Sequence, residues 1–210
     1  MCCLCTVGQV VHTLPEGEGV CGVTSLDNEI FLLRIKEHDH LDEVEVYDVI
    51  TYRLQRCLTV PNFRGFSDMT SCEHYHCLYI GSFECVHRLH VHIQGAATQW
   101  PVYDAPTRLS VNAAHNVIVT CNLDRKIKEF SSHGDLLREL TLPDDIITPW
   151  HTIQSRSGQF IECHGWYDDP IHPVCMISAD RRPSYCPLAR WSAGFRHWSV
   201  QCTNPLGSWR

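Results

Sequence analysis

Residues 109–143, LSVNAAHNVIVTCNLDRKIKEFSSHGDLLRELTLP, decide the fold because they predict four short strands separated by three turns. Apolar and β-branched residues recur at strand spacing, and Asn, Asp, Gly and Ser fill the turns between them. Pro143 stops the last strand. The stretch therefore predicts one complete four-stranded unit, with strands at residues 109–112, 117–121, 126–131 and 136–142.

The same pattern recurs along the chain at a constant period. Corresponding units begin at residues 23, 66, 109 and 151, so the period is 42 or 43 residues. Four short strands in a period of about 40 to 45 residues are typical of β-propeller blades. No sustained helical pattern is present, which disfavours helical repeats of similar length. We predict an all-β fold, a partial β-propeller of about four four-stranded blades at residues 23–65, 66–108, 109–150 and 151–180.

The two ends of the chain depart from this period. Residues 1–22 are expected to be an outer strand of a preceding blade or an irregular N-terminus, since VVHTLP at 10–15 resembles LRELTLP at 137–143. Residues 181–210 are predicted to be an irregular tail, because they lack Asp, Glu and Lys and show no strand or helix periodicity. Permitted codons for this tail, read one base later, can end in VPTRLAV, which resembles APTRLSV at 105–111. We interpret the tail as frame-shifted or unstructured.

Composition favours a cytoplasmic protein. With 44% hydrophobic residues in 210, the chain can bury a core. No apolar run approaches the ~18 residues of a membrane span, and the N-terminus lacks the features of a signal peptide. The odd number of cysteines, 13, argues against a disulfide framework. Six of them fall in apolar strands and are expected to be buried thiols: Cys57, Cys77, Cys85, Cys121, Cys163 and Cys175.

Two segments were considered as metal sites, and neither is assigned. An acidic loop contains Asp39, Asp42, Glu43 and Glu45, but their spacing matches no calcium loop, so we expect a solvated surface. A Cys- and His-rich segment resembles a zinc ligand set, but strand alternation sends neighbouring residues to opposite faces, so few of its side chains are expected to converge. Its candidates are Cys72, His74, His76, Cys77, Cys85, His87, His90 and His92.

The units at 23–61, 109–143 and 151–180 resemble NHL-type blades. Over about residues 20 to 180 the chain is similar to uncharacterised animal proteins with NHL-like six-bladed β-propeller repeats. It lacks the Gly-rich stretch before the first three blades, as well as WD40 signatures. The resemblance implies a module that binds proteins or, in some members, RNA. On this basis four blades of six would leave open sheet edges, giving a truncated product with no independent activity or one that needs a partner to close the ring.

Charge disfavours the RNA alternative. The tail carries five of the 17 Lys and Arg and none of the 24 Asp and Glu, so residues 1–180 hold 12 basic and 24 acidic side chains, a net charge of −12. Phosphate binding depends on Lys and Arg, and strand alternation scatters the local basic group Arg125, Lys126 and Lys128. We therefore expect an unknown protein partner, no nucleic acid and no membrane.

No catalytic motif is present. The sequence lacks GxSxG, P-loop, dinucleotide-binding and HExxH patterns, so we assign no catalytic, cofactor-binding or metal residues and expect a non-enzymatic protein-interaction module. The alternative is a calcium-dependent lactonase or esterase, as in some six-bladed propellers. Its channel-facing ligands would be Glu29, Asp68 and Asn112 or Asn116. An apolar or aromatic patch on the blade-rim face would favour the interaction module. A channel-facing cluster of carboxylates and amides with bound calcium would favour the hydrolase.

Overall fold

The computed structural model of the chain describes residues 3–6, 9–13, 19–34, 43–61, 68–93, 97–104, 106–165, 173–178 and 183–185. Within these ranges the regular structure consists of strands β1 to β18, without helices. Among the same residues no helix is long and apolar enough to cross a membrane. The chain forms two compact units, Met1–Pro106 and Thr107–Arg210.

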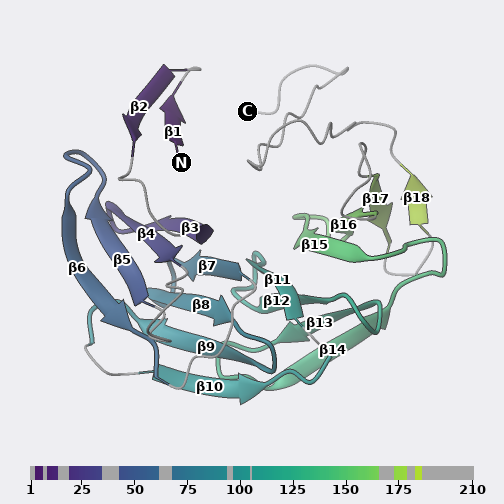
Figure 1. The fold of residues 1–210 in the computed structure, drawn as a ribbon. Coiled ribbons are helices and arrows are strands. Elements are labelled where there is room, and N and C mark those ends of the chain that lie inside the picture. Colours follow the sequence, from purple (N-terminus) through teal and green to yellow (C-terminus); the bar gives the residue numbers. More distant parts are fainter. Residues whose placement is uncertain are drawn as a thin grey trace. The chain divides into compact units, whose positions relative to one another are not determined.

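The first unit contains two four-stranded antiparallel sheets in which neighbours in sequence are neighbours in the sheet (Figure 1). One sheet is built from β3 (Val20–Leu26), β4 (Glu29–Arg34), β5 (Glu43–Asp48) and β6 (Leu54–Thr59). The other comprises β7 (Asp68–Cys72), β8 (Cys77–Gly81), β9 (Cys85–His90) and β10 (Ala97–Pro101). The N-terminal strands β1 (Cys3–Thr6) and β2 (Gln9–Thr13) form a separate antiparallel pair.

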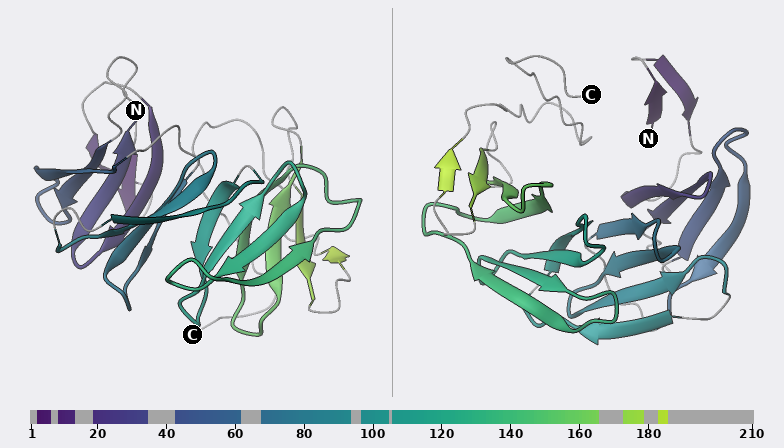
Figure 2. Two further views of the ribbon diagram at one scale, coloured as in Figure 1. Left: turned by 90° about the horizontal axis from the view of Figure 1, so that it is seen from below. Right: turned by 180° about the vertical axis from the view of Figure 1, so that it is seen from behind.

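The second unit contains two four-stranded antiparallel sheets of the same design (Figures 1 and 2). The first is formed by β11 (Pro106–Val111), β12 (Val117–Cys121), β13 (Lys126–Phe130) and β14 (Leu136–Thr141). These strands confirm the four-stranded unit predicted for residues 109–143. The second sheet is formed by β15 (Pro149–Gln154), β16 (Phe160–His164), β17 (Val174–Ile177) and β18 (Pro183–Tyr185).

The last strand lies where the sequence predicted an irregular tail. β18 pairs with β17 in antiparallel fashion, with Cys175 opposite Tyr185. A three-residue segment, Pro-Ser-Tyr, is too short to show alternation, so sequence periodicity could not find it. Residues 186–210 lie outside the described residues, and their irregular or frame-shifted character stays a prediction. At the other end of the repeats, β3 begins at Val20, three residues before the predicted start of the first blade.

Burial differs with a strand's position in its sheet. Every residue of β8 and β12, the second strands, is buried. The fourth strands β6 and β14 have one sheet neighbour each and expose most of their residues. This corrects one expectation: Cys57 lies on β6 and is exposed. Cys77, Cys121 and Cys175 are buried as expected, whereas Cys85 and Cys163 are half-buried.

The core of the first unit lies between its two four-stranded sheets. There β3 and β7 approach so closely that a Cβ added at Gly22 would lie 2.9 Å from the Cβ of Met69. Thr24 Oγ1 and Ser71 Oγ form a hydrogen bond of 2.8 Å across the same contact. The buried cluster takes residues from both sheets: Leu26, Phe31, Leu33, Val44, Val46, Val60, Met69, Leu78, Ile80, Leu89 and Val91.

The core of the second unit is built in the same way. Ser110 Oγ donates a hydrogen bond of 2.7 Å to the carbonyl of Thr152, which joins the first strands of the two sheets. Thr120 Oγ1 donates to Thr152 Oγ1 at 2.9 Å. The apolar cluster consists of Ile118, Ile127, Leu140, Leu142, Ile146, Phe160, Cys175 and Ile177. In both units, therefore, a four-stranded sheet buries its face only by stacking on its neighbour.

Candidate functional site

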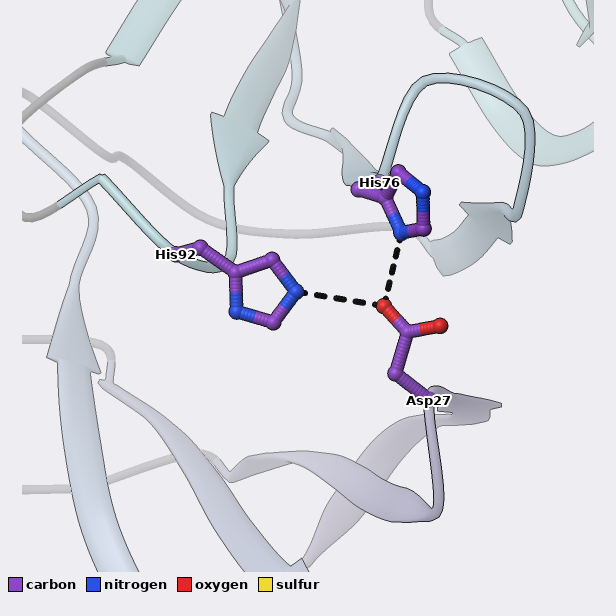
Figure 3. A group of neighbouring side chains, drawn as sticks. All are labelled: Asp27, His76 and His92. Atoms are coloured by element: carbon purple, nitrogen blue, oxygen red, sulfur yellow. Dashed lines mark hydrogen bonds and ion pairs between the residues drawn. The ribbon is translucent and has the colours of Figure 1, made fainter.

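One carboxylate and two imidazoles converge where three turns of the first unit meet (Figure 3). Asp27 lies in the turn between β3 and β4, His76 lies directly before β8, and His92 follows β9. Asp27 Oδ2 is 2.7 Å from His76 Nδ1 and 3.2 Å from His92 Nε2. The rings of His76 and His92 have centroids 5.9 Å apart. We call these three residues the Asp–His–His cluster.

The backbone holds the cluster together. Asp27 and Asn28 have φ of 49° and 63°, as a tight two-residue hairpin turn requires. His76 also adopts the left-handed region, with φ of 46°, and its carbonyl accepts the Val91 amide at 3.3 Å. That hydrogen bond ties the turn carrying His76 to the residue before His92.

The cluster faces solvent and carries an anion. The side chains of His76, His92 and Asp27 are 57%, 59% and 36% exposed. Hydrogen bonds from His76 and then His92 lower the pKa of Asp27 below its usual value. Asp27 is therefore a carboxylate at neutral pH. The cluster offers two ring nitrogens and one anionic oxygen as possible metal-ligand atoms.

The cluster contains two of the eight zinc candidates considered from sequence. His76 and His92 lie in turns, where side chains do not alternate between the two faces of a sheet as they do along a strand. Both can therefore point toward the same place. Asp27 was missed because it lies 49 residues from His76 in the sequence. The sequence signal that it shares with His76 is a polar residue in the turn between the first and second strands of adjacent repeats.

The other candidates in this segment lie elsewhere. Cys72 and Cys77 face each other across β7 and β8, and both are buried and free. His74 packs edge-on against Tyr75, with ring centroids 4.6 Å apart. His90 is half-buried, and burial followed by the charge of Arg88 lowers its pKa.

A hollow of about 440 Å³ lies beside the turn between β8 and β9. Two of its aromatic side chains are largely exposed, Phe83 by 67% and Tyr103 by 82%. Glu84 and Gln99 supply polar groups to the same hollow, and the largely buried Trp100 forms part of its lining. We call this feature the aromatic hollow; it is lined by Ser82, Phe83, Glu84, Cys85, Gln99, Trp100, Pro101 and Tyr103.

One thiol of the aromatic hollow contacts a buried histidine. Cys85 Sγ lies 3.2 Å from His87 Nε2 and 2.9 Å from Ser82 Oγ. His87 is 1% exposed, and burial lowers its pKa, so its ring is neutral at pH 7. A neutral imidazole beside a thiol can accept the thiol proton.

Most of the residues considered for a hydrolase site are engaged within their own sheets. Glu29 forms a bidentate ion pair with Arg56. The side-chain amides of Asn112 and Asn116 both donate to Glu129 Oε1 at 2.9 Å. Asp68 lies half-buried on β7.

The acidic loop residues that the structure describes have local partners as well. Glu45 Oε2 accepts from Arg34 at 2.6 Å and from Tyr47 at 2.8 Å. Glu43 is half-buried at the start of β5. Asp39 and Asp42 lie outside the described residues.

No protein-family model matches the chain, and no curated protein sequence matches it. Solved structures do match. Selenomethionine-substituted virginiamycin B lyase from Staphylococcus aureus is 14% identical, with a TM-score of 0.66 over 86% of this chain and 60% of its own. A protein of unknown function from Bacteroides caccae is also 14% identical, with a TM-score of 0.56 over 89% and 66% of the two chains.

A protein from Lactobacillus plantarum is 11% identical, with a TM-score of 0.60 over 88% of this chain and 74% of its own. The chain spans less than two thirds of the length of the virginiamycin B lyase structure. At such identities the likeness shows the fold alone. It confirms the predicted all-β architecture: this chain has a β-propeller fold built from four-stranded blades.

Proposed function

We propose that this β-propeller is a protein-interaction module and that its aromatic hollow binds a basic segment of the partner. The observation that carries the proposal is the exposure of Phe83 and Tyr103 on one hollow of about 440 Å³. Large exposed aromatic groups beside a hollow are typical of places where another molecule docks. An exposed aromatic patch of this kind supports an interaction module rather than a hydrolase.

Charge determines the chemistry of the partner. The chain has a net charge of −7, and Glu84 places a carboxylate beside the aromatic rings. A Lys or Arg side chain is attracted both to a carboxylate and to the face of an aromatic ring. We therefore infer that the partner presents a Lys or Arg to this hollow, flanked by apolar residues.

The local basic group does not favour nucleic acid. Arg125 pairs with Asp144 at 2.8 Å, and Lys126 and Lys128 lie 3.0 and 3.6 Å from the carboxylate of Glu139. Two carboxylates, Asp144 and Glu139, thus offset most of the charge of these three cations. Little net positive charge remains at this group to attract the phosphate backbone of a nucleic acid.

We also propose an NHL-like relationship and a cytoplasmic location. The period of 42 or 43 residues and the four-strand blade support the first. The second is supported by the odd number of cysteines, 13, and by the burial of Cys77, Cys121 and Cys175 on apolar strands, where a reduced Cys packs as a small apolar residue.

A peptide array tests the proposed function. Arrays of short peptides with a central Lys or Arg, and matched arrays with Glu at that position, are probed with the whole purified chain. The proposal predicts binding to the basic series only, and loss of that binding in Phe83→Ser/Tyr103→Ser. Equal binding to both series, or no effect of the double substitution, would contradict it.

A second candidate is enzymatic, and it rests on the contact of Cys85 with His87. A thiol beside a neutral imidazole in a hollow has the arrangement of a nucleophile and its base. Virginiamycin B lyase, which shares the fold, is named as an enzyme. Thioester, ester and lactone substrates, assayed with and without Ca²⁺, test this candidate and the calcium-dependent hydrolase together. Turnover lost in Cys85→Ser would favour a thiol enzyme, and turnover that requires Ca²⁺ but not Cys85 would favour the hydrolase.

A further inference from the structure

We propose that the Asp–His–His cluster binds one Zn²⁺, held by Asp27 Oδ2, His76 Nδ1 and His92 Nε2, with an open fourth position (Figure 3). The site is independent of the aromatic hollow, because the two share no residue. Three protein ligands with one open position are typical of zinc sites that bind water or an added ligand.

The geometry is close to that of a zinc site. Bonds of about 2.0–2.1 Å in a tetrahedral arrangement place two ligand atoms about 3.3 Å apart. His92 Nε2 lies 3.2 Å from Asp27 Oδ2, which is already at this separation. His76 Nδ1 lies 2.7 Å from the same oxygen, and all three atoms are within 4.8 Å of one another. Small rotations of exposed side chains would complete the set.

The three ligand atoms are also of the right chemical kind. Zinc binds neutral imidazole nitrogen and carboxylate oxygen, and Asp27 is ionised at neutral pH. Each ring already turns one nitrogen toward the carboxylate, so binding would replace two hydrogen bonds with metal–ligand bonds. Ca²⁺ and Mg²⁺ prefer oxygen ligands and would bind poorly to a set with two nitrogens.

The backbone holds the three ligand residues close together in the metal-free protein. Asp27 sits on a two-residue turn, and the His76 carbonyl is bonded to the Val91 amide. Both four-stranded sheets of the first unit contribute to the cluster, and a hydrogen bond between Thr24 and Ser71 joins β3 to β7. A ligand set already positioned in this way loses little conformational freedom when it binds a metal.

The test uses the whole chain after treatment with a chelator, in a Cys57→Ser background that removes the exposed thiol on β6. Zn²⁺ affinity is measured by competition with a chromophoric chelator, and Co²⁺ serves as a spectroscopic probe of the ligands. The variants are Asp27→Asn, His76→Ala and His92→Ala. His133→Ala is the control, since His133 is an exposed turn histidine of the second unit.

We expect one Zn²⁺ per chain, and an affinity weakened more than about tenfold in each cluster variant, since even loss of a residue that only orients a ligand costs about 10- to 100-fold. His133→Ala should bind like the parent. The Co²⁺ complex should show visible bands without thiolate charge transfer. Circular dichroism of each variant, compared with the parent, separates loss of a ligand from loss of the fold.

Three results would overturn the proposal. Equal Zn²⁺ affinity in the parent and in His76→Ala and His92→Ala would place the metal elsewhere. A thiolate band in the Co²⁺ spectrum would assign it to cysteine. Absence of binding at millimolar Zn²⁺ would leave the cluster as a hydrogen-bonded surface group.

Discussion

Thr152 Oγ1 donates a hydrogen bond to Oε2 of Glu162, and both side chains are buried between the two sheets of the second unit. Burial raises the pKa of Glu162 to about 8, so the carboxyl group is protonated and neutral at pH 7. Its Oε1 has no hydrogen-bond partner among the described residues. A neutral acid can lie there, but its anion would be poorly solvated.

The buried Glu162 predicts that stability falls as pH rises. The folded pKa of about 8 lies above the unfolded value of 4.5, so the folded state holds the extra proton between these limits. Stabilisation is complete below pH 4.5 and is lost as pH rises toward 8, at up to about 1.4 kcal/mol per pH unit. His151, whose pKa is lowered to about 4 chiefly by burial, has the opposite effect between pH 4 and 6.5. The window from pH 6.5 to 8 therefore separates the effect of Glu162 from that of His151.

Glu162→Gln tests this account, because the amide resembles the protonated acid and does not titrate. The free energy of unfolding of Glu162→Gln and of the parent is measured in urea at pH 6.5 and 8. Relative to the parent, the variant should become more stable as pH rises. Parallel pH dependence in the two proteins would show that Glu162 does not titrate in this range.

Two substitutions of glycine by alanine, one of them a control, test the contact between the sheets of the first unit. Gly22→Ala places a methyl group 2.9 Å from Met69 Cβ, and relief requires β3 and β7 to move apart. We expect a larger loss of unfolding free energy than in the control below, toward the upper end of the about 1–3 kcal/mol that overpacked cores lose. Gly158→Ala is the control: it has φ of 85° and no atoms near the new methyl, so only backbone strain of about 1 kcal/mol applies. Equal losses would show that the approach of β3 to β7 is not tight.

Asn112 is predicted to stabilise the second unit through several hydrogen bonds. Its amide donates to Glu129 and Gln154, and its Oδ1 accepts the backbone amides of Ala114 and Asn116. At about 1 kcal/mol per bond, Asn112→Ala should lower the unfolding free energy by roughly 2–4 kcal/mol. Asn116→Ala removes one side-chain bond, to Glu129, and should cost about 1 kcal/mol. Urea denaturation measures both, and a larger loss for Asn116 would refute the assignment.

Thiol reactivity should follow burial. Cys57 is exposed, whereas burial raises the pKa values of Cys163 and Cys175 to about 12. At pH 8 we expect Cys57 to react with a disulfide reagent in the folded protein, and Cys163 and Cys175 to react only on unfolding. Peptide mapping by mass spectrometry identifies the sites. Rapid labelling of Cys175 in the folded chain would contradict its position in the core.

The sequence predicted the fold well because a β-propeller repeats its strands at a fixed period. β13 was predicted to within one residue because alternation and turn residues bound it on both sides. The exposure of Cys57 was missed because alternation does not identify the outer strand of a sheet. β18 was missed because three residues show no period.

The candidate sites were harder to predict because they depend on contacts between distant segments. The pairing of Asp27 with His76 and His92 joins neighbouring blades through turns, which strand periodicity does not place. The aromatic hollow combines Phe83 with Tyr103, and nothing in the spacing of these residues indicates that both line one hollow. Similarly, Glu162 differs from the many surface carboxylates only in its burial, which the sequence does not show.

The affinity of the aromatic hollow for a basic peptide tests the central claim most directly. The Lys- or Arg-containing peptide selected on the array would be titrated by calorimetry into the parent chain, Glu84→Gln and Phe83→Ser/Tyr103→Ser. We expect both variants to bind more than about tenfold more weakly, a difference of about 1.4 kcal/mol, with the melting temperature preserved because Phe83 and Tyr103 are exposed. Unchanged affinity in both variants would contradict the claim that this hollow is the partner-binding site.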